Sequence, residues 1–263
     1  MCTLIVLHGC LPEIPLAVGA NRDEFYGRPA EGPALRNLEF SAIVAPLDIR
    51  AGGTWLGLNE HGLFAAVTNR PMQEQASDPQ RRSRGLLVLD ALRERSAIAA
   101  MEKLEQLPAQ AYNSFNLLVA DRNSVHAITY AQTVRRVDLP SGPTVICNAD
   151  PAAPPTPKLT KLLARANQIS ARAPRDVLDE LAKICRSHDS EGDAFRSACI
   201  HAGEYGTRSS ALIRFGEDPR DTEFRFTDRP PCESEYQDYT PLLRELDDGC
   251  QLDEGETAAR KQR

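Results

Sequence analysis

The feature that most constrains the fold is the repeated pairing of short apolar segments across turn residues. Residues 54–58 and 63–68 flank the turn Asn59-Glu60-His61-Gly62, and residues 115–120 and 125–130 flank the turn Asp121-Arg122-Asn123-Ser124. Such pairs predict β-hairpins, in which a residue such as Gly62 adopts positive φ. Similar apolar runs predict further strands at residues 3–7, 16–20, 134–139, 144–147, 209–215 and 222–227.

Two helical blocks interrupt the strands. Leu86, Leu89 and Leu92 recur at helical spacing within residues 84–93, and Ser96 is suited to cap a helix that follows. Residues 158–171 and 175–186 predict a second pair of helices. Hairpins imply antiparallel sheets and helix pairs imply covering layers, so we expect one α+β domain of stacked layers over residues 1–243. The polar stretch 244–263 is expected to be a disordered tail.

Composition narrows the function classes. The net charge of −6 argues against nucleic acid as the main partner. An apolar run of about 18 residues, which an integral membrane helix needs, does not occur. Leu4 to Leu7 is too short for a secretory signal. Seven scattered cysteines without a C-x-x-C pair favour reduced thiols, so a soluble, cytoplasmic protein is expected.

Cys2 is the first residue that could perform chemistry. Removal of Met1 would leave a cysteine with a free α-amine, whose ordinary pKa of about 8 lets it act as a base near neutral pH. Amine and thiol would then lie on one residue, which is the arrangement of an N-terminal nucleophile. The alternative is a structural cysteine buried at the start of a strand.

The polar cluster Asn21-Arg22-Asp23-Glu24 follows an apolar strand, where it could face a site. Asp23 could hold a protonated α-amine, and Arg22 could receive a substrate carboxylate. The alternative is a solvated turn with an internal ion pair.

Carboxamides and one further arginine complete the candidates. Asn69 ends a predicted strand, and Asn148 follows another, so both could donate to an oxyanion. Arg208 could lower the pKa of the thiol. Trp55, the single tryptophan, lies between glycine turns. The alternative for Asn69 is a turn with an Asx cap.

Cys185, His188, Cys199 and His201 form a C-x2-H-x10-C-x-H pattern that could hold zinc. The C-x-H spacing is unusual for zinc, and a polar loop is the favoured interpretation. No metal site is therefore predicted.

Several motifs together resemble the NRDE family, the group that contains the transport and Golgi organisation protein two. They are Met1-Cys2-Thr3, Ala20-Asn21-Arg22-Asp23-Glu24-Phe25-Tyr26 with Arg28-Pro29, Gly52-Gly53-Thr54-Trp55-Leu56-Gly57, Phe115-Asn116-Leu117-Leu118 and Tyr205-Gly206-Thr207-Arg208. The resemblance spans roughly residues 1–230. It implies an Ntn-hydrolase-like four-layer αββα sandwich with mostly antiparallel sheets.

The family is distantly similar to cysteine amidohydrolases that cleave penicillin V and conjugated bile salts. This resemblance implies five catalytic residues, namely Cys2 as nucleophile, Asp23, Asn69, Asn148 and Arg208. Asn21, Arg22 and Trp55 are expected to contact the substrate.

The leading hypothesis is an N-terminal cysteine hydrolase that acts on an amide or thioester bond of a small molecule and requires no cofactor. The family resemblance also implies handling of haem or acyl compounds, so a non-catalytic carrier that uses the same cleft is the alternative. None of the five histidines stands out as a haem ligand. A third hypothesis is a trafficking scaffold with an inactive site.

Overall fold

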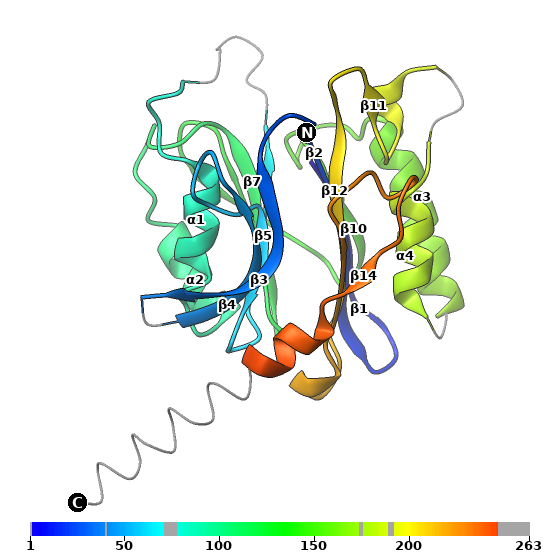
Figure 1. Cartoon of the computed structure of the whole chain (residues 1–263), viewed down its shortest axis with the longest axis horizontal. Coiled ribbons are helices and arrows are strands. Elements are labelled where there is room, and N and C mark those ends of the chain that lie inside the picture. Colours follow the sequence, from blue (N-terminus) through cyan, green and yellow to red (C-terminus); the bar gives the residue numbers. More distant parts are fainter. Residues whose placement is uncertain (1, 40, 71–77, 174–175, 189–191, 247–263) are drawn as a thin grey trace, which may run out of the picture.

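Two antiparallel sheets face each other in the middle of the molecule, and one pair of helices covers the outer face of each sheet (Figure 1). The computed structural model describes residues 2–39, 41–70, 78–173, 176–188 and 192–246. The layers therefore run helix, sheet, sheet, helix, which confirms the expected four-layer αββα sandwich.

The first sheet carries the beginning of the chain at its centre. Its path runs β10-β1-β2-β12-β13-β14, and β11 pairs with β12. The strands are β1 (Cys2–Leu11), β2 (Ile14–Phe25), β10 (Gly142–Ile146), β11 (His201–Ala202), β12 (Tyr205–Arg214), β13 (Glu223–Thr227) and β14 (Gln237–Asp238).

The second sheet follows chain order from β3 to β9. Each strand therefore pairs with its sequence neighbour, as expected for hairpin connections. The strands are β3 (Ala30–Leu38), β4 (Ser41–Asp48), β5 (Leu56–Asn59), β6 (Phe64–Asn69), β7 (Phe115–Ala120), β8 (Val125–Tyr130) and β9 (Val134–Val137).

The helices begin at residues that satisfy their first backbone N–H groups. Ser83, Ser96, Thr156 and Asp176 each accept a hydrogen bond from the first helical turn. The helices α1 (Arg84–Ala91) and α2 (Ala97–Leu104) cover the second sheet, whereas α3 (Pro157–Arg172) and α4 (Val177–Cys185) cover the first. Short 3-10 turns η1 (Ala194–Arg196) and η2 (Pro219–Asp221) lie in connections, and residues 240–246 are helical.

Strand alternation decides which core each side chain enters. Leu4 and Val6 of β1 point into the core between the sheets, while Ile5 and Leu7 pack under α3 and α4. By the same alternation Cys2 shares the inter-sheet face with Leu4. Both faces of the first sheet are therefore buried, and the sheet holds the candidate nucleophile rigidly.

Most of the expected elements are present. The predicted hairpin strands at residues 115–120 and 125–130 match β7 and β8, and Gly62 has φ of +73°. The sequence analysis missed β3 and β4, in which Pro33 and Pro46 interrupt the apolar pattern. Residues 244–246, assigned to the tail, are helical with Leu246 buried, and 247–263 lie outside the described residues.

Within the described part of the chain, no helix is long and apolar enough to cross a bilayer.

Candidate active site

A polar pocket opens where β1 begins and β2 ends, at the ends of central strands of the two facing sheets. Five predicted site residues line it, namely Cys2, Arg22, Asp23, Trp55 and Asn69. The other lining residues are Glu24, Arg28, Asp48, Ala51, Thr54, Val67, Ser83, Arg84 and Gly85. Residues far apart in the sequence thus converge on one thiol.

The thiol of Cys2 is held by the pairing of β1 with β2. Cys2 is the cross-strand partner of Arg22 and is only 7% exposed. Burial raises the pKa of the Cys2 thiol above its ordinary value, and the Asp23 backbone hydrogen bond and the Arg22 charge act in the opposite direction. A thiol in this environment needs a local base to become a good nucleophile.

The guanidinium of Arg22 is held by Trp55 and Asp48, but one of its nitrogens has no hydrogen-bond partner among the described residues. Its guanidinium stacks on Trp55, with 4.1 Å from Cζ to the ring centroid, and Nη2 donates to Asp48 at 3.1 Å. Arg28 donates to the same carboxylate oxygen at 2.7 Å. The buried Nη1 of Arg22 has no hydrogen-bond partner among the described residues. Because an unpaired buried donor is costly, Arg22 is suited to bind a ligand oxygen.

Asp23 is fully buried behind the nucleophile. Its Oδ1 accepts a hydrogen bond of 2.6 Å from the Thr207 hydroxyl. Burial raises the pKa of Asp23 to about 6, although Lys158 and Thr207 act in the opposite direction. A buried carboxyl with such a pKa has a strong preference for a nearby cation, such as a protonated amine on Cys2.

The two candidate carboxamide residues, Asn69 and Asn148, lie next to each other, but only Asn69 lines the pocket. Asn69 ends β6 and lines the pocket. The Nδ2 of Asn148 donates to the backbone carbonyl of Asn69. Asn148 therefore positions the backbone of Asn69. Asn148 itself is not among the described residues that line the pocket.

The structure does not bring Arg208 to the thiol. Arg208 is the extra residue of a β-bulge, because Thr207 pairs with Asp23 and Ser209 pairs with Arg22. Its guanidinium binds Asp228 at 2.8 Å and lines a separate surface pocket. Arg22 and Arg84 are arginines whose charges interact with Cys2 instead.

Asn21 does not face the pocket either. Its Nδ2 donates to the carbonyls of Cys185 and Ala198, both at 2.9 Å, and its Oδ1 accepts from Ser210 at 2.6 Å. Asn21 therefore ties β2 to the segments packed on its helical side. A substrate would have no polar atom of this side chain left to bind.

Arg84 is a pocket residue that sequence reasoning missed. Gly53 and Gly85 approach so closely that the start of α1 reaches the pocket, and Thr54 N donates to Gly85 O at 3.2 Å. Arg84 Nη1 donates to the Ser114 carbonyl at 3.1 Å, and Arg84 forms no salt bridge with another described residue. Gly53 and Gly85 were the available signal in the sequence. Their role in bringing Arg84 to the pocket can be recognised only when the two segments are seen in contact.

Three of the four residues with possible zinc spacing lie together. His188, Cys199 and His201 cluster with Cys232, which the sequence analysis did not include. Cys185 is not a member, because it is buried in the core under α4. The end of α4 turns Cys185 toward Gly19 of β2, with Sγ 3.1 Å from the position of a Cβ there.

Comparison with known proteins identifies the relatives of this chain. A family model described as Transport and Golgi organisation 2 matches residues 1–229. The Transport and Golgi organization protein 2 homolog of Homo sapiens is 29% identical over 243 residues, which cover 81% of this chain and 86% of that protein.

Solved structures with the same architecture are distant in sequence. A variant of conjugated bile acid hydrolase from Clostridium perfringens has a TM-score of 0.57 at 12% identity, covering 90% of this chain and 96% of that chain. Penicillin V acylase from Agrobacterium tumefaciens has a TM-score of 0.54 at 13% identity, covering 87% and 83%. At this identity the likeness establishes the Ntn-hydrolase fold.

Proposed function

The chain belongs to the Transport and Golgi organisation 2 family, and from that premise and its Ntn-hydrolase fold we propose that it is an N-terminal cysteine hydrolase. Its substrate is a small molecule with an amide or thioester bond and an anionic group. The observation that carries the proposal is the convergence of Cys2, Arg22, Asp23 and Asn69 on one pocket. Cys2 stands at the second position, where removal of Met1 exposes its amine.

The reaction begins with a proton transfer on one residue. The α-amine of processed Cys2 takes the thiol proton, since its ordinary pKa of about 8 is close to neutral. The thiolate then attacks the acyl carbon, and the C=O electron pair moves to the oxygen. The buried carboxylate of Asp23 stabilises the resulting ammonium group of Cys2.

Collapse of the tetrahedral intermediate completes acylation. The side-chain amide of Asn69 donates to the oxyanion, while Asn148 holds the Asn69 backbone in place. The ammonium group of Cys2 returns its proton to the leaving amine or thiolate, and an acyl-cysteine remains. Water, deprotonated by the same amine, attacks this thioester and releases the acid, which restores the thiol.

Arg22 and Arg84 support the choice of an anionic substrate. Both arginines line the pocket. Among the described residues, the buried Nη1 of Arg22 has no hydrogen-bond partner and Arg84 forms no salt bridge. Burial lowers the pKa of both guanidinium groups, because holding a charge away from water is unfavourable. A carboxylate ligand would offset that cost.

The test combines mass spectrometry with trapping of the acyl-enzyme. We expect intact mass to show a chain that lacks Met1 and that gains one acyl group when mixed with an anionic acyl thioester. Cys2→Ala should abolish the gain, whereas Cys10→Ser, on the same strand, should retain it. A fully retained Met1, or acylation that survives Cys2→Ala, would refute the mechanism.

A second candidate function is a carrier for a carboxylate-bearing ligand such as an acyl compound or haem. The arginines at the pocket favour it, because they bind carboxylates without requiring turnover. Such a carrier predicts that Cys2→Ala protein still binds the ligand, measured for haem by a shift of its Soret band. If no spectral change follows at micromolar haem, the haem form of this function is excluded.

A further inference from the structure

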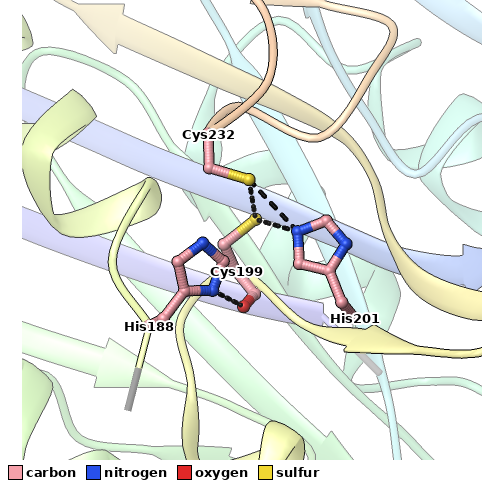
Figure 2. Close-up of side chains that lie close together, drawn as sticks. All are labelled: His188, Cys199, His201 and Cys232. Carbon is pink, nitrogen blue, oxygen red and sulfur yellow. Dashed lines mark hydrogen bonds between the residues drawn. The ribbon is translucent and has the colours of Figure 1, made fainter. Parts of the chain in front are cut away.

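Four side chains with soft or borderline donor atoms converge behind the first sheet, away from the Cys2 pocket (Figure 2). They come from three segments: His188 follows α4, Cys199 and His201 lie at the start of β11, and Cys232 follows β13. One potential ligand atom from each residue lies within 4.8 Å of the other three. Such convergence of separate segments is what a metal centre requires.

The distances among three of the donor atoms are close to those of a tetrahedral zinc shell. Cys199 Sγ lies 3.4 Å from Cys232 Sγ and 3.8 Å from His201 Nε2, and His201 Nε2 lies 3.1 Å from Cys232 Sγ. Tetrahedral ligands with Zn–S of about 2.3 Å and Zn–N of about 2.0 Å are separated by roughly 3.3 to 3.8 Å. The potential ligand atom of His188 lies within 4.8 Å of these three, so the four side chains would have to contract around the ion.

The second nitrogen of each imidazole already has a partner. His188 Nδ1 lies 3.0 Å from the Cys199 carbonyl, and His201 Nδ1 lies 3.2 Å from the Tyr26 hydroxyl. A hydrogen bond from Nδ1–H fixes the tautomer in which Nε2 is an acceptor, as is usual for histidines that bind metal. Both rings therefore present Nε2 to the same space.

From this geometry we propose that His188, Cys199, His201 and Cys232 bind one zinc ion. Binding requires both thiols to lose their protons to solvent, so the site carries two thiolates and two neutral imidazoles. Four protein ligands fill the tetrahedral shell and leave no position for a substrate, so the role is structural. The proposal is independent of the hydrolase activity.

The zinc site would stabilise the wall behind the nucleophile. Ile200, between two of the ligands, donates its backbone N–H to Thr207 Oγ1 at 2.8 Å, and that hydroxyl donates to Asp23 at 2.6 Å. The ion would also link the segment after α4 to the loop after β13. Loss of the metal should therefore loosen the support of Asp23.

Elemental analysis of the full-length protein, purified without chelators under reducing conditions, tests the proposal. We expect one zinc per chain in the wild type and in Cys10→Ser, and loss of zinc in Cys232→Ser and in His188→Gln. Both of these variants change exposed residues, so they should fold. Cobalt(II) in place of zinc should give the intense visible bands of a tetrahedral site with thiolate ligands.

Three outcomes would overturn the proposal. The first is that reduced wild-type protein takes up no zinc in equilibrium dialysis. The second is that the Cys232→Ser variant binds zinc as well as the wild type. The third is a disulfide between Cys199 and Cys232 in freshly isolated protein, because the two sulfurs would then be bonded to each other and not to a metal.

Tyr26 provides a finer test, since its hydroxyl lies 3.2 Å from Nδ1 of the proposed ligand His201. Tyr26→Phe should weaken zinc affinity by about tenfold, measured by competition with a chromophoric chelator. Tyr239→Phe, whose hydroxyl bonds to Gln237 instead, should leave the affinity unchanged. If Tyr26→Phe and Tyr239→Phe bind zinc with equal affinity, the contact between Tyr26 and His201 Nδ1 does not hold His201 Nε2 in place as a zinc ligand.

Discussion

The guanidinium carbon of Arg22 lies over the ring of Trp55, 4.1 Å from its centroid, while the buried Nη1 of Arg22 has no hydrogen-bond partner among the described residues. The tryptophan and Asp48 together fix the orientation of the cation. Because a fixed cation beside a thiol attracts anionic reagents, we expect the pocket to favour them over neutral ones.

Substitution Arg22→Gln should remove that selectivity. Alkylation of Cys2 by iodoacetate should slow about tenfold more than alkylation by neutral iodoacetamide, because only the former carries a charge. The measurement is the ratio of the two rates, followed by peptide mass spectrometry at Cys2. Arg122→Gln, on an exposed loop, is the control, and an unchanged ratio in Arg22→Gln would show that Arg22 does not attract anions.

The buried carboxyl of Asp23 predicts a pH dependence of stability. With a pKa of about 6 against an ordinary 3.8, the native state keeps a proton that the unfolded state loses between these values. The free energy of unfolding should therefore fall as pH rises from about 4 to 6, by up to about 3 kcal/mol, and then level off.

Asp23→Asn is the matched variant for this effect, because it keeps an acceptor for Thr207 and loses the titration. Urea unfolding of both proteins across pH 4 to 7 isolates the contribution as a difference. Parallel stability curves would mean that Asp23 has an ordinary pKa in the native state.

Asn21→Ala should destabilise the fold without changing the pocket. The substitution leaves the carbonyls of Cys185 and Ala198 without their donor, at a cost of about 2 to 4 kcal/mol. The ratio of iodoacetate to iodoacetamide alkylation at Cys2 should stay at the wild-type value. Asn123→Ala, in an exposed turn, provides the control for chemical denaturation. A changed alkylation ratio with unchanged stability would restore Asn21 as a substrate contact.

Gly53→Ala should push α1 away from the pocket. A Cβ there would lie 2.6 Å from Leu86 N and in contact with the Gly85 carbonyl carbon, which are backbone atoms that cannot rotate away. We expect a loss of about 1 to 3 kcal/mol in unfolding free energy. Gly27→Ala, which would meet nothing within 4 Å, should be nearly neutral. Equal thermal stability of the two variants would argue against this close approach.

Local pattern was enough for most of the elements. The hairpin of β7 and β8 was predicted to the residue, and Ser96 caps α2 as expected, because strand alternation and capping depend on neighbours in the sequence. Strand β3 was missed because Pro33 and the charged residues Glu31 and Arg36 interrupt its apolar pattern. Such a strand is specified by its partner β4 more than by its own residues.

The residues of the candidate site also fall into two groups, those that the sequence pattern places and those that only the tertiary structure places. The amino-acid sequence by itself determined that Cys2 begins a strand, that Asn69 ends one, and that a cysteine follows Met1. It placed Arg22 after the strand of residues 16–20, whereas β2 continues to Phe25. Only the tertiary structure decided that a bulge sends Arg208 to Asp228, that close contact of two glycines brings Arg84 to the pocket, and that Cys232 joins two histidines and a cysteine. The physical reason is that periodicity fixes the face on which a side chain lies, whereas partners distant in sequence are fixed by sheet register and packing.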